Sequence, residues 1–148
     1  MNAKLTPKLT PKLTAAEIID FLDEVFPQAQ GMFVIEEAGA LHSRVRMPID
    51  ERHLRPGDTV SGPSMFWLAD CAFYVAVLAS LGCEGQEAVT TNMNINFMRR
   101  PSLSDLIGEA RILKLGRRLA VGDVTLFSED GSEPVAHATT TYAIPGKG

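Results

Sequence analysis

The sequence contains few residues that bind metals or form disulfides: two cysteines and three histidines among 148 residues. Cys71 and Cys83 would lie about 18 Å apart along one helix axis, which is too far for a disulfide within the chain. No other cysteine completes a zinc site, and His42, His53 and His137 lack the spacing of metal ligands. We therefore expect reduced thiols, no metal ion and a cytoplasmic protein.

An excess of basic residues is also lacking. The formal net charge is -4, from 14 Lys and Arg against 18 Asp and Glu. Such a balance gives no general attraction to nucleic acid or to an anionic membrane, so we expect neither as a partner. No signal-peptide pattern is found at the N-terminus. The length, with 45% hydrophobic and 22% charged residues, is typical of one soluble globular domain.

Charge is almost absent from Pro63–Leu81, where Asp70 is the only charged residue. The segment is apolar on nearly every face, which predicts a buried core helix, and an acid near its middle argues against a membrane span. We predict Gly62 as the N-cap and Pro63 as the first helical residue, so Asp70 lies too far inside to cap the helix. An unpaired buried carboxylate is costly. Asp70 is thus either a structural group paired with a neighbouring Ser or Thr, or a catalytic group.

The remaining pattern divides the chain into an arm and one domain. The repeat Lys4–Thr14 contains two prolines and no core-forming pattern, which predicts a flexible basic arm over residues 1–14 and a folded domain over residues 15–148. Thr14 and Glu17 match a capping box that begins a short helix, ended by Pro27. Glu51–Ser61 is expected to be an irregular loop. Alternating or apolar segments predict strands at Gly31–Ala38, Leu41–Ile49, Ala88–Met98, Leu106–Leu115, Leu119–Ser128 and Val135–Ile144.

This order of elements predicts the α+β class, with an antiparallel sheet wrapped around one long helix. In the strand that follows the helix, alternate side chains divide into two sets. We expect the apolar set to face the helix and the polar set to face water or another subunit. The two sets are Met93, Ile95 and Phe97, and Asn92, Asn94 and Asn96.

The order of elements and several motifs resemble the hotdog fold, and in particular the PaaI-like acyl-CoA thioesterases, relatives of 4-hydroxybenzoyl-CoA thioesterase. The family signature is a loop Asn, then His-Gly-Gly, then an apolar half-helix that ends in Leu-Ala-Asp. The segment Arg55–Asp70 resembles this signature and ends in Leu-Ala-Asp. The resemblance continues in Asn96–Pro101, Gly116–Leu119 and Val135–Ala138.

The resemblance implies a role for one residue inside the helix and two at its start. Asp70 takes the position of the catalytic carboxylate, a nucleophile or a general base for water. Gly62 takes the position of the glycine whose N–H polarises the thioester carbonyl, a role that suits the free N–H groups of a helix N-terminus. Ser61 stands where the family has histidine and can still donate a hydrogen bond. Pro63 and Arg55 replace the second glycine and the loop asparagine.

Helix geometry argues that the active unit is a dimer. Gly62 and Asp70 are about 12 Å apart along one helix axis, so one carbonyl group cannot reach both. If both act on one thioester, they come from two subunits, and a twofold homodimer creates two such sites. The resemblance implies edge-to-edge pairing through the strand that contains Asn92–Phe97, and further assembly to a tetramer is compatible with it.

The resemblance also implies the residues that bind substrate. Arginines at the pocket mouth suit the phosphates of CoA, and we expect these residues to form one local basic cluster. Apolar residues near the helix start suit an acyl or aryl group. The expected cluster is Arg99, Arg100, Arg117 and Arg118, and Arg55 is a further predicted binding residue. The predicted acyl-lining residues are Met65, Phe66, Trp67 and Tyr74.

We therefore predict a hotdog acyl-CoA thioesterase that needs no cofactor, because CoA is part of the substrate. The changes at Ser61 and Arg55 leave open a non-catalytic module that binds acyl-CoA or lipid. An assembly subunit without a ligand is a further alternative. Hydratase chemistry is disfavoured because it uses an Asp–His pair that the sequence does not offer. We predict a surface position for His53.

Overall fold

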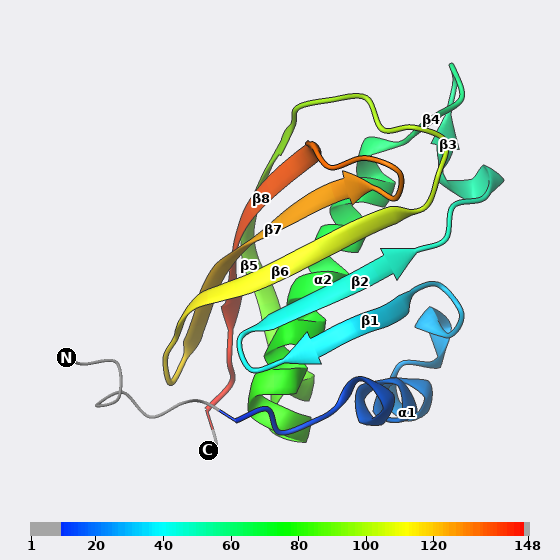
Figure 1. Cartoon of the computed structure of the whole chain (residues 1–148). Coiled ribbons are helices and arrows are strands. Elements are labelled where there is room, and N and C mark those ends of the chain that lie inside the picture. The colour runs from blue at the N-terminus through cyan, green and yellow to red at the C-terminus, as the bar shows by residue number, and fades with distance from the viewer. Residues whose placement is uncertain (1–9, 147–148) are drawn as a thin grey trace.

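The computed structural model describes residues 10–146 and contains one long helix, α2 (Gly62–Leu81), wrapped by a six-stranded sheet (Figure 1). All neighbouring strands run antiparallel, in the order β1-β2-β6-β7-β8-β5. This arrangement confirms the predicted hotdog fold. The strands are β1 (Val34–Gly39), β2 (His42–Met47), β5 (Val89–Phe97), β6 (Leu106–Leu115), β7 (Leu119–Ser128) and β8 (Pro134–Ala143).

Helix α2 supplies the centre of the core, as the apolar segment predicts. Leu68, Ala72 and Phe73 are fully buried against the sheet. Within the described residues α2 and its extension are apolar enough to cross a membrane, but 61% of the most apolar window is buried inside the fold. The predicted N-cap was wrong by one residue. Ser61 is the N-cap because its hydroxyl accepts a hydrogen bond from the Ser64 N–H, which glycine cannot do.

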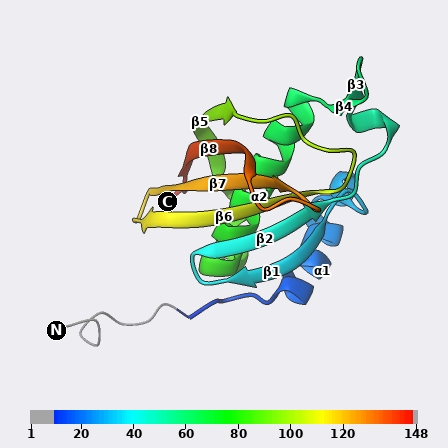
Figure 2. The same cartoon turned by 45° about the horizontal axis from the view of Figure 1, so that its top comes forward.

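Helix α1 (Ala15–Val25) packs at the end of the sheet that carries β1 (Figure 2). It begins with the predicted capping box between Thr14 and Glu17, and a short 3-10 turn, η2 (Pro27–Ala29), follows it. Residues 1–9 of the predicted arm lie outside the described residues. Of the part described, the Lys12 N–H donates to the Ala79 carbonyl of α2 at 2.7 Å.

The segment before α2 is more ordered than the irregular loop expected from the sequence. It contains a 3-10 turn, η3 (Glu51–His53), and a hairpin of β3 (Leu54–Arg55) and β4 (Thr59–Val60). Asp58 adopts a positive φ of 52° in the turn of this hairpin. Strands of two residues are too short to show a sequence period, so the pattern could not predict them. After α2, another 3-10 segment, η4 (Gly82–Glu87), leads into β5.

Strand β5 lies at an edge of the sheet and, among the described residues, pairs only with β8. Met93 and Ile95 are half-buried against the core, as predicted. Phe97 was expected to face the helix in the same way but is 52% exposed, because its ring lies at the open start of α2. The three asparagines of β5 are exposed on its other face.

Candidate active site

Asp70 is half-buried, and two hydroxyl groups bind the same oxygen of its carboxylate. Thr90 of β5 and Tyr142 of β8 each donate to Asp70 Oδ1 at 2.6 Å. Burial, and then the charge of Asp70, raise the pKa of the Tyr142 phenol far above its usual value, so the phenol remains a donor. Among residues 10–146, no group donates a hydrogen bond to Asp70 Oδ2. One oxygen is therefore held by two hydroxyl groups, and the other is open to a further partner.

Three of the predicted lining residues share the open face of α2 with Asp70, because residues three or four positions apart lie on one helix face. Phe66 is 39% exposed, whereas Trp67 and Tyr74 are half-buried. The Trp67 ring meets Phe33 edge-on at 5.9 Å, and the Tyr74 hydroxyl donates to the main chain of η4. The fourth predicted residue, Met65, is buried on a different face of the helix.

The thiol beside Asp70 is not a candidate nucleophile. Burial, and then the charge of Asp70, raise the pKa of the Cys71 thiol well above its usual value, so the thiol stays protonated. Cys71 and Cys83 are both free, as expected. Within the part of the chain that the structure describes, no group of three or more His, Cys, Asp or Glu side chains is arranged to hold a metal ion.

A cavity of about 730 Å³ opens beside the first turn of α2. It brings together five of the predicted site residues: Gly62, Met65, Arg55, Arg99 and Arg100. Exposed Phe97 and Met98 form an apolar part of the wall. The cavity thus combines an apolar surface with three guanidinium groups, which suits an amphipathic anion.

The glycine at this cavity leaves a backbone donor at its surface. The Gly62 N–H has no acceptor among residues 10–146, as is usual for the first position of a helix. A Cβ atom at this position would meet the Phe97 ring at 3.4 Å, so the ring lies directly beside the glycine. The Ser61 hydroxyl accepts from the Ser64 N–H and bonds the Ser64 hydroxyl at 2.9 Å. Ser61 therefore uses its hydroxyl to cap the helix.

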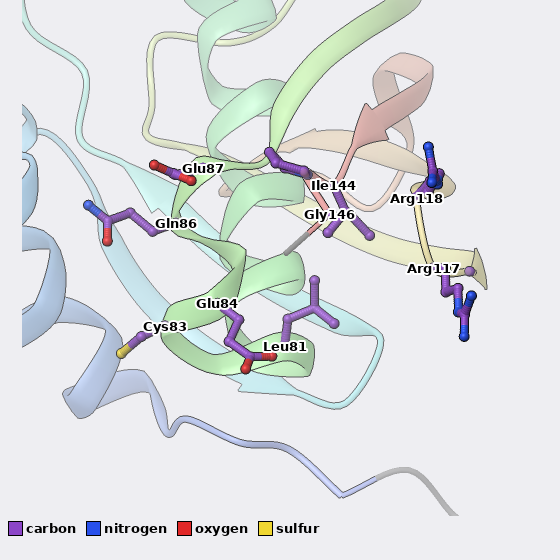
Figure 3. Close-up of a pocket in the computed structure, with 11 residues that line it drawn as sticks. Leu81, Cys83, Glu84, Gln86, Glu87, Arg117, Arg118, Ile144 and Gly146 are labelled. Carbon is purple, nitrogen blue, oxygen red and sulfur yellow. The ribbon is translucent and has the colours of Figure 1, made fainter. Parts of the chain in front are cut away.

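The predicted arginines do not form the single cluster expected within one chain. Arg117 and Arg118 lie in the β6–β7 turn, at a separate cavity of about 860 Å³ (Figure 3). Leu81 also lines this cavity, so it lies at the opposite end of α2, about 28 Å from Gly62 along the helix axis. Arg99 and Arg100 lie at the Gly62 end. The sequence alone does not show this separation, because the separation depends on the end of the sheet at which each turn and strand terminus lies.

Two polar residues near the site differ from the sequence interpretation. Tyr142 was not predicted as a site residue. The alternation of β8 places it on the inward face of the sheet, where its hydroxyl needs a hydrogen-bond partner, and this signal could have identified it. His53 was expected on the surface, but its side chain is only 12% exposed and its Nδ1 accepts from the Asp50 N–H. It lines a small cavity of about 250 Å³ together with Pro63 and Trp67.

The sequence pattern of the thioesterase superfamily matches residues 57–135, more than half of the chain. The chain belongs to the thioesterase superfamily. A solved structure from Silicibacter sp. TM1040, provisionally described as a thioesterase, is 52% identical, with 93% of this chain and 95% of that chain covered and a TM-score of 0.80. Membership in the superfamily supports thioester hydrolysis as the general chemistry of the chain.

More distant solved structures share the fold. Zebra fish thioesterase superfamily member 2 is 22% identical, with 90% of this chain and 100% of that chain covered and a TM-score of 0.79. A variant of the phenylacetic acid degradation protein PaaI from Thermus thermophilus is also 22% identical, with coverage of 80% and 99% and a TM-score of 0.68. A search of curated proteins finds no match.

Proposed function

We propose that this thioesterase hydrolyses the thioester of an acyl-CoA or aryl-CoA to the free acid and CoA. The observation that carries the proposal is the carboxylate of Asp70, whose Oδ1 is held by two hydroxyl groups and whose Oδ2 takes no donor from residues 10–146. The free N–H of Gly62 supplies the second element that acyl transfer requires, a donor for the oxyanion.

These two elements do not meet within one chain. Asp70 does not line the cavity at Gly62, and the helix separates the two residues by about 12 Å. A group that takes part in proton transfer must lie within hydrogen-bond reach of the reacting atoms. The proposed site therefore requires a second copy of α2.

Strand β5 offers a way to bring the two helices together, because it contacts both elements of the site. Near its start, Thr90 binds Asp70; at its end, the Phe97 ring lies beside Gly62. Suppose that two β5 edges pair antiparallel, with the twofold axis at Asn94, so that opposite residues share one face of the sheet. Because of the bulge near the start of β5, Thr90 then lies opposite Phe97 of the partner subunit, and Asp70 approaches the helix start of that subunit. The pairing creates two identical composite sites.

The exposed surface around β5 supports this homodimer. Val89, Phe97 and Met98 are each more than half exposed, and Phe66 on the open face of α2 is 39% exposed. Covering such apolar area contributes roughly 25 cal/mol per Å². Pairing also removes an unprotected sheet edge, which proteins otherwise shield. The tetramer stays a prediction.

The same pairing brings the separated arginines together. The register aligns Leu119 with Ala143 and Ala143 with Val89, so the β6–β7 turn lies at the level where β5 begins. In the proposed dimer, the start of one β5 lies beside the end of the other β5, which Arg99 and Arg100 follow. The β6–β7 turn of one subunit is then three strand spacings, about 14 Å, from the end of β5 in the other subunit. One CoA nucleotide between the two subunits can contact arginines from both, which suits its phosphates.

The proposed reaction uses each element in one step. The Gly62 N–H donates to the thioester carbonyl oxygen and stabilises the negative charge that develops there. Asp70 Oδ2 either takes a proton from a water molecule as the water oxygen bonds to the carbonyl carbon, or bonds to that carbon itself. The C–S bond breaks, and the CoA thiolate leaves and takes up a proton. In the second route, water then hydrolyses the mixed anhydride and restores the carboxylate.

The test is the hydrolysis of a panel of acyl-CoA and aryl-CoA thioesters by the wild type and by Asp70→Asn. The amide keeps the size of the carboxylate but cannot act as base or nucleophile, so we expect kcat to fall about 100-fold or more. Equal turnover by the two proteins would remove Asp70 from the mechanism. Tight binding of acyl-CoA in calorimetry with no turnover by either would favour the non-catalytic binding module.

A further inference from the structure

Tyr142 makes the most constrained contact with Asp70. Its hydroxyl lies 2.6 Å from Asp70 Oδ1 and 3.0 Å from the Asp70 main-chain oxygen. A phenol has one proton to donate, and a charged acceptor at the shorter distance is favoured over the amide oxygen. The hydroxyl therefore sits between the backbone and the side chain of one residue, where it restricts rotation of the carboxylate.

The surroundings of Tyr142 make it a rigid donor. The residue is 2% exposed, and its ring packs on Phe73 and Tyr74 at centroid distances of 5.1 Å and 6.4 Å. It comes from β8, which is paired on both sides, by β7 and β5. Thr90, the other donor, comes from the exposed edge strand. Of the two hydroxyl groups, that of Tyr142 is the one fixed by the core.

Both donors bind one oxygen, and this has a chemical consequence. A carboxylate oxygen has two lone pairs in the plane of the group, so two donors occupy the acceptor sites of Oδ1. A third partner, such as a water molecule about to lose a proton, then binds Oδ2. We propose that Tyr142 is a positioning residue that makes Oδ2 of Asp70 the reacting atom. This inference rests on the hydrolysis proposed above.

The contacts of Asp70 also show what orients its side chain. Among residues 10–146, the side chain interacts with Tyr142 on β8, Thr90 on β5 and the neutral thiol of Cys71 on α2. No cationic side chain is among these groups. The orientation of the carboxylate therefore depends on the two hydroxyl donors.

The experiment compares Tyr142→Phe with a matched control, Thr140→Val. The first keeps the ring and removes the hydroxyl. The second removes another buried hydroxyl of β8, which donates to the Asn92 carbonyl at 3.1 Å and does not contact Asp70. For Tyr142→Phe we expect kcat to fall about 10- to 100-fold with little change in KM. Thr140→Val should change neither constant.

An unchanged kcat in Tyr142→Phe would overturn the inference, provided that Asp70→Asn abolishes hydrolysis. If Asp70→Asn has no effect, the proposed function fails instead. A readout without turnover is the NMR chemical shift of the Asp70 carboxyl carbon at fixed pH, which should change in Tyr142→Phe and stay the same in Thr140→Val. Should Tyr142→Phe not fold, fluorotyrosine at position 142 keeps the shape and strengthens the donor. Both kcat and the carboxyl chemical shift should then change, and no change in either would overturn the inference.

Discussion

The composite site predicts that two inactive variants restore each other. One variant is Asp70→Asn. The other exchanges two neighbours, Gly62→Pro with Pro63→Gly, which removes the N–H at position 62 and keeps a proline in the first turn. Ser61 already has φ -72° and ψ 152°, the conformation preferred before proline, and the first helical position tolerates proline. The exchange should therefore remove one donor and preserve the helix.

The magnitude follows from the proposed role of the Gly62 N–H as the donor that faces the developing oxyanion. Loss of one such donor costs roughly 100- to 1000-fold in kcat. The matched control is Pro63→Gly alone, which keeps the N–H of Gly62 and should keep activity. Circular dichroism and size-exclusion chromatography confirm that all variants fold and assemble.

The assay mixes the two inactive variants in equal amounts, unfolds them together and refolds them. Random assembly makes half of the dimers mixed, and each mixed dimer contains one site with an intact Asp70 and an intact Gly62. Recovered activity should therefore be roughly a quarter of that of the wild type. No recovery, although mixed dimers form, would refute the site between subunits. So would a fully active monomer.

Two further predictions concern the substrate and the sheet. Replacing Arg117 and Arg118 by Gln should raise KM for acyl-CoA about tenfold, because the nucleotide phosphates lose two cationic partners. The KM for an N-acetylcysteamine thioester, which lacks phosphates, should not change. Equal effects on both substrates would exclude a nucleotide contact. Gly122→Ala should lower the free energy of unfolding by about 2–4 kcal/mol in urea denaturation, because a Cβ there would overlap the Arg111 carbonyl oxygen. Gly131→Ala, whose Cβ meets no atom closer than 3.9 Å, is the control, and equal stability of the two variants would contradict the packing argument.

The fold was predictable because its two main signals are long. An apolar run with one acid marks α2, and alternation over nine or ten residues marks each of the four strands that follow it. Short elements gave no such signal. The β3–β4 hairpin has only two residues per strand. The N-cap of α2 is Ser61, one residue before the predicted Gly62.

The site was predictable only in part, because distance along the chain does not give distance in space. The acid was identified from its isolation in an apolar segment, and Thr90 fits the expected Ser or Thr partner. Tyr142 lies 72 residues from Asp70, and no local pattern connects them. The prediction of one arginine cluster was wrong for a single chain, because the sheet places the β6–β7 turn and the end of β5 at opposite ends of α2.

The order of the strands has a consequence for biosynthesis. Of the six strands that cover α2, only β1 and β2 precede it in the chain, and the other four come later. When synthesis of α2 is complete, the nascent chain therefore carries an apolar helix but only a third of the strands that will cover it. Native closure has to await the last strand, β8, which carries Tyr142. Chaperone demand should therefore peak before translation ends.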